Sequence, residues 1–408
     1  MEKHIIAGIP VYLEENHNLP TVAVGFRFEV GSNDEEDYEA GYAHIVEHLM
    51  FKGPKNMSPN EFIAKGDSLS LKLNAHTSKS STLYHFIALK EVLYPAFEMF
   101  LEALVDPAFR QEEIDVELNV ILEEWKMHES DTGSMNVDNF FSLLYPNHPY
   151  GNSIIGKKET IELADSDTIR AFYNKHYKME NVSIFVVGDT TVDEIKDMIS
   201  FFASRLKSDG VSNFEKRPSP DKMPVEHSYH YQKDEPSLQT FYGIRYKGED
   251  KNLLEDKMKL NVLSKVLSAG MSSPLFFKVR VESGLAYHIG MGIMTSYPEH
   301  LVWCNWSCTP SNNGKIKEMV DSIIKDTNNI TEERLEIIKR NVKMDILLQE
   351  TNYQRMNNAV SSVDNYNEYH STEEIIEIVD RISLEDLKDM IPYITENEWV
   401  MTTAGNID

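Results

Sequence analysis

The sequence has few cysteines for its length. Among 408 residues there are only 2, Cys304 and Cys308. They fall in a segment with the composition of a strand, where four residues separate them by roughly 13 Å. They could not form a disulfide without remodelling that strand, because a disulfide joins Cα atoms less than about 7 Å apart. So few cysteines are typical of a reducing compartment, and we expect a cytoplasmic protein.

Basic residues and long apolar runs are also lacking. Lys and Arg total 40 against 66 Asp and Glu, which gives a formal net charge of −26. A surface this acidic repels nucleic-acid phosphates and anionic lipids, so we expect neither nucleic acid nor a membrane as a partner. No apolar run approaches the about 20 residues of a membrane-spanning helix, and residues 1–4 show no signal-peptide pattern.

The length and the hydrophobic share of 41% predict a globular protein of two domains, with about 200 residues in each. Residues 5–14 and 21–30 are rich in β-branched residues and predict a hairpin. Gly-Phe-Arg-Phe at residues 25–28 recurs as Gly-Ile-Arg-Tyr at residues 243–246, an offset of 218, and Val-Gly at 187–188 recurs as Ala-Gly at 404–405, an offset of 217. Such weak internal repeats indicate a duplication.

The pattern His-x-x-Glu-His stands within residues 41–53. Apolar residues at helical spacing predict a buried helix that ends near Gly53. His44 and His48 are then one turn apart on the same face, so both imidazoles can reach one metal ion, with Glu47 beside them. In zinc hydrolases two neutral imidazoles bind the metal while a neighbouring carboxylate takes a proton from water. Chance produces this pattern in fewer than about one such chain in ten, so the motif alone only suggests a metal site. The hypothesis also requires a third ligand.

Residues 111–128 form a second predicted helix, which supplies candidates for that ligand. Its apolar stripe consists of Ile114, Leu118, Ile121, Leu122 and Trp125. Glu117 and Glu124 lie together at one edge of the stripe, whereas Glu123 points away from it. Glu124 is therefore placed to reach an interior metal, with Glu117 two turns away on the same side. Taken alone, both are more often ordinary carboxylates on the flank of a helix.

Two further segments complete a resemblance to a known family. Asn-Ala-His-Thr at residues 74–77 and Arg-Val-Glu-Ser-Gly-Leu-Ala-Tyr at residues 280–287, together with the two helices, resemble motifs of the pitrilysin/insulinase (inverzincin) zinc peptidases. The spacing from His48 to Glu124 resembles that of the short members, which are related to mitochondrial processing peptidase subunits. One departure is that residues 68–73 lack a Gly-Gly pair often found in short members, so we expect a different start to the Asn-Ala strand.

The resemblance implies an α+β fold of two homologous domains, each a mainly antiparallel sheet packed against helices, as in the processing-peptidase/LuxS-like metallohydrolases. The zinc-bearing domain would span residues 1–209, a linker residues 210–224, and a domain without metal residues 225–408. One zinc ion per chain would be bound by His44, His48 and Glu124. Glu47 would be the general base, and Glu117 would orient a ligand histidine or the water.

The resemblance also implies how substrate is bound. Asn74 and Ala75 would hold an extended peptide by strand addition, and Arg280 and Tyr287 would contact the substrate and the oxyanion. Taken alone, Arg280 is more probable as a surface arginine and Tyr287 as a half-buried tyrosine. Because this chain has both sets, it resembles members that form homodimers, in which the second domain of one chain completes the active site of the other.

The resemblance therefore implies a zinc-dependent endopeptidase that hydrolyses peptides or unfolded segments inside a closed chamber, with the water activated by Glu47. The net charge of −26 favours basic peptides only weakly. One alternative is a catalytically silent binding or assembly subunit of the same fold, although the intact Glu47 argues against it. Another alternative is a zinc hydrolase that acts on a different class of substrate.

Overall fold

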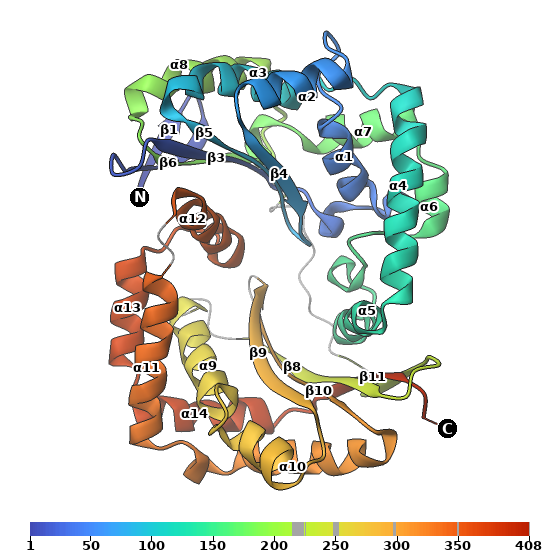
Figure 1. Cartoon of the computed structure of the whole chain (residues 1–408), viewed down its shortest axis with the longest axis vertical. Coiled ribbons are helices and arrows are strands. Elements are labelled where there is room, and N and C mark those ends of the chain that lie inside the picture. Colours follow the sequence, from blue (N-terminus) through green and yellow to red (C-terminus); the bar gives the residue numbers. More distant parts are fainter. Residues whose placement is uncertain (214–223, 225, 248–252, 297–298, 349–350, 408) are drawn as a thin grey trace. The chain divides into compact units, whose positions relative to one another are not determined.

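Two mixed β-sheets organise the chain, and each is the centre of one unit of the computed structural model (Figure 1). The structure describes residues 1–213, 224, 226–247, 253–296, 299–348 and 351–407. Unit 1 comprises residues 1–127, 148–220 and 350–361, and unit 2 comprises residues 128–147, 221–349 and 362–408. Most of the predicted linker, residues 214–223, lies outside the described residues, and the boundaries at 209 and 225 stay a prediction.

The sheet of unit 1 has the strand order β1-β2-β6-β3-β5-β4. Its strands are β1 (Glu2–Ile6), β2 (Ile9–Glu15), β3 (Thr21–Phe28), β4 (Lys72–Thr77), β5 (Thr82–Leu89) and β6 (Val182–Gly188). The predicted hairpin of residues 5–14 with 21–30 is wrong. Ala7 and Gly8 both have positive φ, 49° and 90°, so the chain turns back there and pairs β1 with β2. Strand β6 then separates β2 from β3, parallel to the first and antiparallel to the second.

One face of this sheet carries the core of unit 1. The helices of the unit are α1 (Tyr42–Met50), α2 (Pro59–Ser68), α3 (Leu93–Val105), α4 (Gln111–Ser130), α6 (Lys158–Glu162), α7 (Ser166–His176) and α8 (Val192–Arg205). Phe26 of β3 packs between α3 and α8, with its ring centroid 5.9 Å from Phe97, 5.7 Å from Phe100 and 5.6 Å from Phe202. The Ser58 side chain accepts a hydrogen bond from the Glu61 N–H and caps α2, with Pro59 in the first turn.

Among the described strands, the sheet of unit 2 repeats the topology of unit 1 from β2 onward. Its strands are β7 (Ser228–Gln232), β8 (Leu238–Tyr246), β9 (His288–Ser296), β10 (Glu299–Cys308) and β11 (Val400–Gly405), in the order β7-β11-β8-β10-β9. The described helices of unit 2 are α5 (Thr132–Leu144), α9 (Leu253–Ser268), the π-helix η7 (Phe276–Glu282), α10 (Asn313–Lys325), α11 (Glu332–Leu347), α13 (Thr372–Arg381) and α14 (Leu384–Thr395), and α12 (Asn352–Tyr366) is divided between the two units. The predicted α+β fold with two similar sheets is confirmed.

Each unit takes one helix from the other half of the chain. Helix α5 belongs to the first half but packs on β8 and β11, where Phe140 lies 5.7 Å from Phe241 between ring centroids. The first part of α12 belongs to the second half but packs on the sheet of unit 1. A Cβ atom on Gly25 would lie 3.0 Å from Met356 of α12, and one on Gly243 would lie 2.7 Å from Phe140 of α5. The repeated glycine therefore leaves room for the exchanged helix in both units.

Candidate metal centre

Helix α1 presents three polar side chains from an otherwise buried segment. Six of its nine residues are buried: Tyr42, Ala43, Ile45, Val46, Leu49 and Met50. The other three, His44, Glu47 and His48, are partly exposed. Because the apolar residues hold the helix against the core of unit 1, the three polar side chains share the remaining face.

Helix α4 supplies the carboxylates. Its buried residues are Ile114, Glu117, Leu118 and Ile121. The side chain of Glu124 is 36% exposed, whereas that of Glu123 is 70% exposed and pairs with Lys126. The apolar stripe thus fixes the rotation of α4, and Glu117 and Glu124 both lie close to α1.

Three donor atoms converge between α1 and α4. His44 Nε2 lies 3.2 Å from His48 Nε2, and Glu124 Oε2 lies 3.8 Å from the first and 3.5 Å from the second. Zinc–ligand distances of about 2.0 Å in a tetrahedral site require ligand atoms about 3.3 Å apart. These side chains therefore fit a zinc ion, and they form the one group of three or more potential ligands within the part of the chain that the structure describes.

The two histidines differ in their second contacts. His48 Nδ1 lies 2.9 Å from Glu117 Oε1, and the other oxygen of Glu117 pairs with Lys52. Within the described residues, the buried Nδ1 of His44 has no hydrogen-bond partner. The contacts of Glu117 set the Nε2 of His48 toward the donor cluster, since its Nδ1 is occupied.

The pKa values of these groups follow from burial and charge. Burial, with a smaller effect of His48, lowers the pKa of His44 to about 4, so this imidazole is neutral near pH 7. Burial also lowers the pKa of His48, but the hydrogen bond to Glu117 and the nearby carboxylates outweigh it, and the net shift is upward. For Glu117, burial raises the pKa, and the contacts with His48 and Lys52 reverse this to a net lowering.

Glu47 lies beside the cluster and is held by the neighbouring strand. Thr77, at the end of β4, donates a hydrogen bond of 2.5 Å from its hydroxyl to Glu47 Oε2. Burial raises the pKa of Glu47, while the Thr77 hydrogen bond and the charge of His48 act against the shift. A carboxyl group with a raised pKa has increased basicity, as expected of a group that accepts a proton.

Strand β4 is the last strand of its sheet and leaves one backbone edge unpaired among the described strands. Asn74 and Ala75 lie in its middle, and the Asn74 side-chain oxygen accepts a hydrogen bond of 2.9 Å from the Ala75 N–H. An unpaired edge offers backbone groups to an extended peptide. This position is compatible with the predicted role of both residues, which stays a prediction.

Arg280 and Tyr287 lie together in unit 2. Arg280 is in the last turn of η7, and its guanidinium carbon is 4.9 Å from the centroid of the Tyr287 ring and 4.8 Å from that of Phe276. Tyr287 is 80% exposed. The cation therefore makes cation–π contacts with both rings, and Tyr287 lies at the surface. The role of this pair at an active site stays a prediction.

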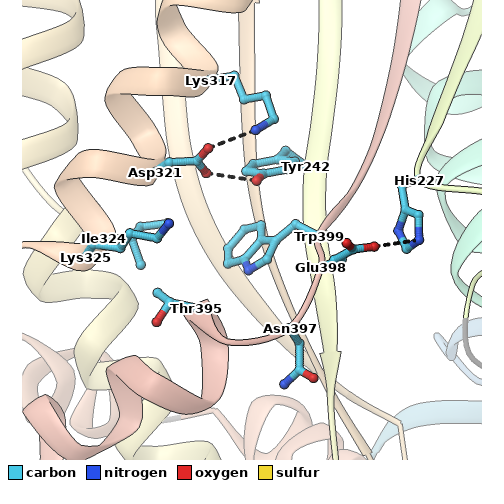
Figure 2. Close-up of a pocket in the computed structure, with 10 residues that line it drawn as sticks. All are labelled: His227, Tyr242, Lys317, Asp321, Ile324, Lys325, Thr395, Asn397, Glu398 and Trp399. Carbon is cyan, nitrogen blue, oxygen red and sulfur yellow. Dashed lines mark hydrogen bonds and ion pairs between the residues drawn. The ribbon is translucent and has the colours of Figure 1, made fainter.

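A separate cavity of about 400 Å³ lies in unit 2 between α10, the end of α14 and the sheet (Figure 2). Tyr242 donates a hydrogen bond of 2.8 Å to Asp321, and Lys317 pairs with the other oxygen of Asp321 at 2.8 Å. The Trp399 ring lies 4.8 Å from that of Tyr242. The cavity contains none of the predicted site residues, and its polar side chains mostly bind one another.

A duplicated α+β fold, with one His/His/Glu cluster among the residues that the structure describes, is typical of the class of zinc-peptidase-like proteins. Two family profiles match the chain. One, described as insulinase (peptidase family M16), matches residues 10–158, and the other, described as peptidase M16 inactive domain, matches residues 164–342. The chain belongs to peptidase family M16, the pitrilysin/insulinase family.

Individual relatives cover nearly the whole chain. An uncharacterized zinc protease of Rickettsia bellii is 28% identical over 91% of this chain and 90% of its own length. The uncharacterized zinc protease YmxG of Bacillus subtilis is 27% identical over 98% of this chain and 97% of its own length. A protease from Helicobacter pylori of known crystal structure has a TM-score of 0.87 at 22% identity, with 99% of both chains covered, which shows the same fold.

Two side chains of the site, Lys52 and Thr77, have no role that we predicted from the sequence. Lys52 comes four residues after His48, so helical spacing could have placed it beside Glu117. Thr77 ends the Asn-Ala-His-Thr segment, but its contact with Glu47 depends on how β4 packs against α1. Helical spacing could therefore have predicted the contact of Lys52 with Glu117, but not that of Thr77 with Glu47.

Proposed function

We propose that this chain is a zinc-dependent endopeptidase that hydrolyses peptides or unfolded segments. The observation that carries the proposal is the approach of His44 Nε2, His48 Nε2 and Glu124 Oε2 to within 3.2–3.8 Å of one another, with Glu47 on the same helix face. The relatives named zinc proteases support it. The alternative of a catalytically silent subunit has less support, because such a subunit would not need Glu47.

Each side chain has a distinct part in the proposed reaction. A zinc ion bound by His44, His48 and Glu124 would supply a Lewis acid. Glu47 accepts a proton from the attacking water and passes it to the leaving amine, and its raised pKa suits both steps. Thr77 orients Glu47 through its hydrogen bond. Glu117 holds His48 in the tautomer that leaves Nε2 free for the metal.

The remaining roles concern substrate. Asn74 and Ala75 bind an extended peptide along the open edge of β4. Arg280 and Tyr287 contact the substrate and the developing oxyanion. We further propose a homodimer with a closed chamber, in which these two residues serve the active site of the partner chain, and a cytoplasmic location. A chamber of this kind would exclude folded proteins.

The test of the reaction is cleavage of a quenched peptide library by the wild type, by Glu47→Gln and by chelated protein resupplied with zinc. Removal of the base should lower kcat by about 10³-fold or more, with zinc still bound. Ser264→Ala, the counterpart of position 47 in the second repeat, is the matched control and should keep full activity. Activity that survives Glu47→Gln would rule out this base, and a zinc-loaded wild type without activity would favour the silent binding subunit.

The test of the homodimer mixes two inactive variants, Glu47→Gln and Tyr287→Phe. If each chain completes the site of its partner, mixed dimers contain one intact site and activity returns toward a quarter to a half of the wild type. Subunit exchange must be verified by mass or fluorescence. Exchange without recovered activity would contradict catalysis across subunits.

A further inference from the structure

The first turn of α1 lacks a capping side chain of its own. Its N-cap residue is Gly41, with φ of 98° and no side chain. The first hydrogen bond within the helix runs from the Ile45 N–H to the Gly41 carbonyl, so the preceding N–H groups need other acceptors. No larger residue fits at the cap, because a Cβ atom on Gly41 would lie 2.9 Å from the carbonyl oxygen of Ile155.

Glu35 supplies the missing acceptors from six residues upstream. One carboxylate oxygen accepts the Gly41 N–H at 2.9 Å, and the other accepts the Ala43 N–H at 2.8 Å. Glu35 is 6% exposed. Burial raises its pKa to about 8, whereas the two N–H donors favour the ionised form. The ionised form of Glu35 also places its negative charge at the positive end of the helix dipole.

The loop before α1 directs this one carboxylate inward. Asp34 accepts the Gly31 N–H at 2.9 Å, and Glu39 accepts the Glu36 N–H at 3.0 Å. These bonds brace the short helices η1 (Ser32–Asp34) and η2 (Asp37–Glu39) on either side of Glu35. Of the acidic residues in the loop, only Glu35 is tied to α1 by the hydrogen bonds described.

We propose that Glu35 is a positioning residue of the metal centre, which holds the first turn of α1 so that His44 and Glu47 keep their places. The inference rests on the proposed zinc site, although not on peptidase activity. His44 is the third residue of α1, inside the turn that Glu35 caps. A nine-residue helix has few bonds to resist fraying, so loss of the cap would move a metal ligand.

The experiment measures the metal site directly in Glu35→Gln. The amide keeps the size of the side chain, but its NH₂ group would face one of the two backbone N–H donors. We expect zinc affinity, from chelator competition, to fall by about 10- to 100-fold, and the visible spectrum of the cobalt-loaded protein to change. In the metal-free protein, the Gly41 and Ala43 amides should exchange hydrogen faster than in the wild type.

The matched control is Glu39→Gln, in the same loop and also 6% exposed, but bonded to Glu36 and to Lys175 of α7 rather than to α1. It should keep the zinc affinity and cobalt spectrum of the wild type even where it lowers the melting temperature. Equal effects of the two variants on zinc affinity, or wild-type affinity in Glu35→Gln, would overturn the proposal.

If Glu35→Gln does not fold, hydrogen exchange of the Gly41 and Ala43 amides in the wild type tests the proposal instead. Unprotected Gly41 and Ala43 amides would also overturn the proposal. Since none of these measurements uses a peptide, an inactive protein with the expected zinc response would contradict the proposed function and leave the role of Glu35 standing. If His44→Ala leaves zinc binding unchanged, the metal site itself is wrong.

Discussion

The two units share one sheet topology, but among the described residues only unit 1 has a candidate metal cluster. The order β2-β6-β3-β5-β4 in unit 1 recurs as β7-β11-β8-β10-β9 in unit 2, and in both the first two strands of that order are parallel. An offset of 217 residues puts α9 in the place of α1 and α11 in the place of α4. The same pair of helices thus exists in both units.

Every polar residue of the metal cluster is replaced in the second repeat. At the same offset, Asn261, Ser264 and Lys265 stand for His44, Glu47 and His48, and Arg334 and Asn341 stand for Glu117 and Glu124. Arg334 donates a hydrogen bond of 2.7 Å to the Ala269 carbonyl and another to the Val266 carbonyl, at the end of α9. These carbonyls would otherwise lack partners within the helix.

The helix pair is joined in a different way in each unit. In unit 2 an arginine binds the end of α9, whereas in unit 1 the carboxylate of Glu117 binds His48 and Lys52 at the corresponding junction. In unit 2 the pair therefore packs without the side chains of the candidate metal cluster. We expect from this that the metal site can be removed from unit 1 with little loss of fold, and that Arg334 can be removed with no loss of metal binding.

The largest expected effect is that of Glu124→Ala on zinc affinity. Without the third ligand the site has two imidazoles, and the affinity should fall by at least about 100-fold. Asn341→Ala is the matched change in unit 2 and should leave the affinity unchanged. Chelator competition measures both. An equal effect of the two variants, or no effect of Glu124→Ala, would contradict the assignment of the metal to unit 1.

Zinc itself should stabilise one unit and not the other. A ligand at 100 times its Kd stabilises the state that binds it by about 2.7 kcal/mol. Hydrogen exchange followed by mass spectrometry, with and without zinc, should show slower exchange with zinc for peptides from α1 and α4. Peptides from α9 and α11 provide the internal control. Equal protection of both helix pairs would mean that the units unfold together or that zinc binds elsewhere.

Arg334→Met should have the opposite pattern to Glu117→Gln. Loss of charged hydrogen bonds to the α9 carbonyls should destabilise unit 2 by about 2 kcal/mol, with zinc affinity unchanged. Glu117→Gln should lower zinc affinity by about 10- to 100-fold and change the stability of the metal-free chain less. Urea unfolding measures the stability of both variants, and chelator competition measures their zinc affinity. A loss of zinc affinity in Arg334→Met would contradict the prediction.

The sequence predicted the parts of the fold that depend on local periodicity. The helix wheel separated Glu124 from Glu123, because the apolar stripe of residues 111–128 is buried on one side. The repeat of Gly25 at Gly243 indicated a duplication, and the structure gives its reason, since both glycines face an exchanged helix. These features each arise from a few neighbouring residues.

What the sequence did not predict depends on contacts distant along the chain. The hairpin prediction failed because β6, more than 150 residues away, inserts between β2 and β3. The exchange of α5 and α12 leaves no mark in either helix that identifies its partner sheet. Glu35 is one of several acidic residues in its loop, and only the folded backbone shows that it reaches Gly41 and Ala43.

The smallest expected effect concerns how the two equivalent helices begin. Where unit 1 caps α1 with a buried carboxylate, α9 is longer and carries a half-buried cation, Lys257, in its first turns. Its ammonium lies 5.0 Å from the centroid of the Tyr366 ring, and no carboxylate pairs with it in the described part of the chain. Burial lowers the pKa of Lys257 to about 8. By contrast, Lys259 pairs with Glu255 at 3.0 Å, which helps to raise its pKa.

Removal of this charge should stabilise unit 2 in a pH-dependent way. Between about pH 8 and the ordinary lysine value of about 10.4, the unfolded chain binds more protons than the folded one, so the free energy of unfolding contributed by Lys257 rises with pH. Lys257→Met should therefore be more stable than the wild type at pH 7 by about 1–2 kcal/mol, and this difference should shrink from pH 8 to 10.

Lys259→Met, which removes a paired cation, should be less stable than the wild type across that range. Urea unfolding from pH 7 to 10 measures both variants, and a pH-independent difference for Lys257→Met would show that the buried amine is not the cause.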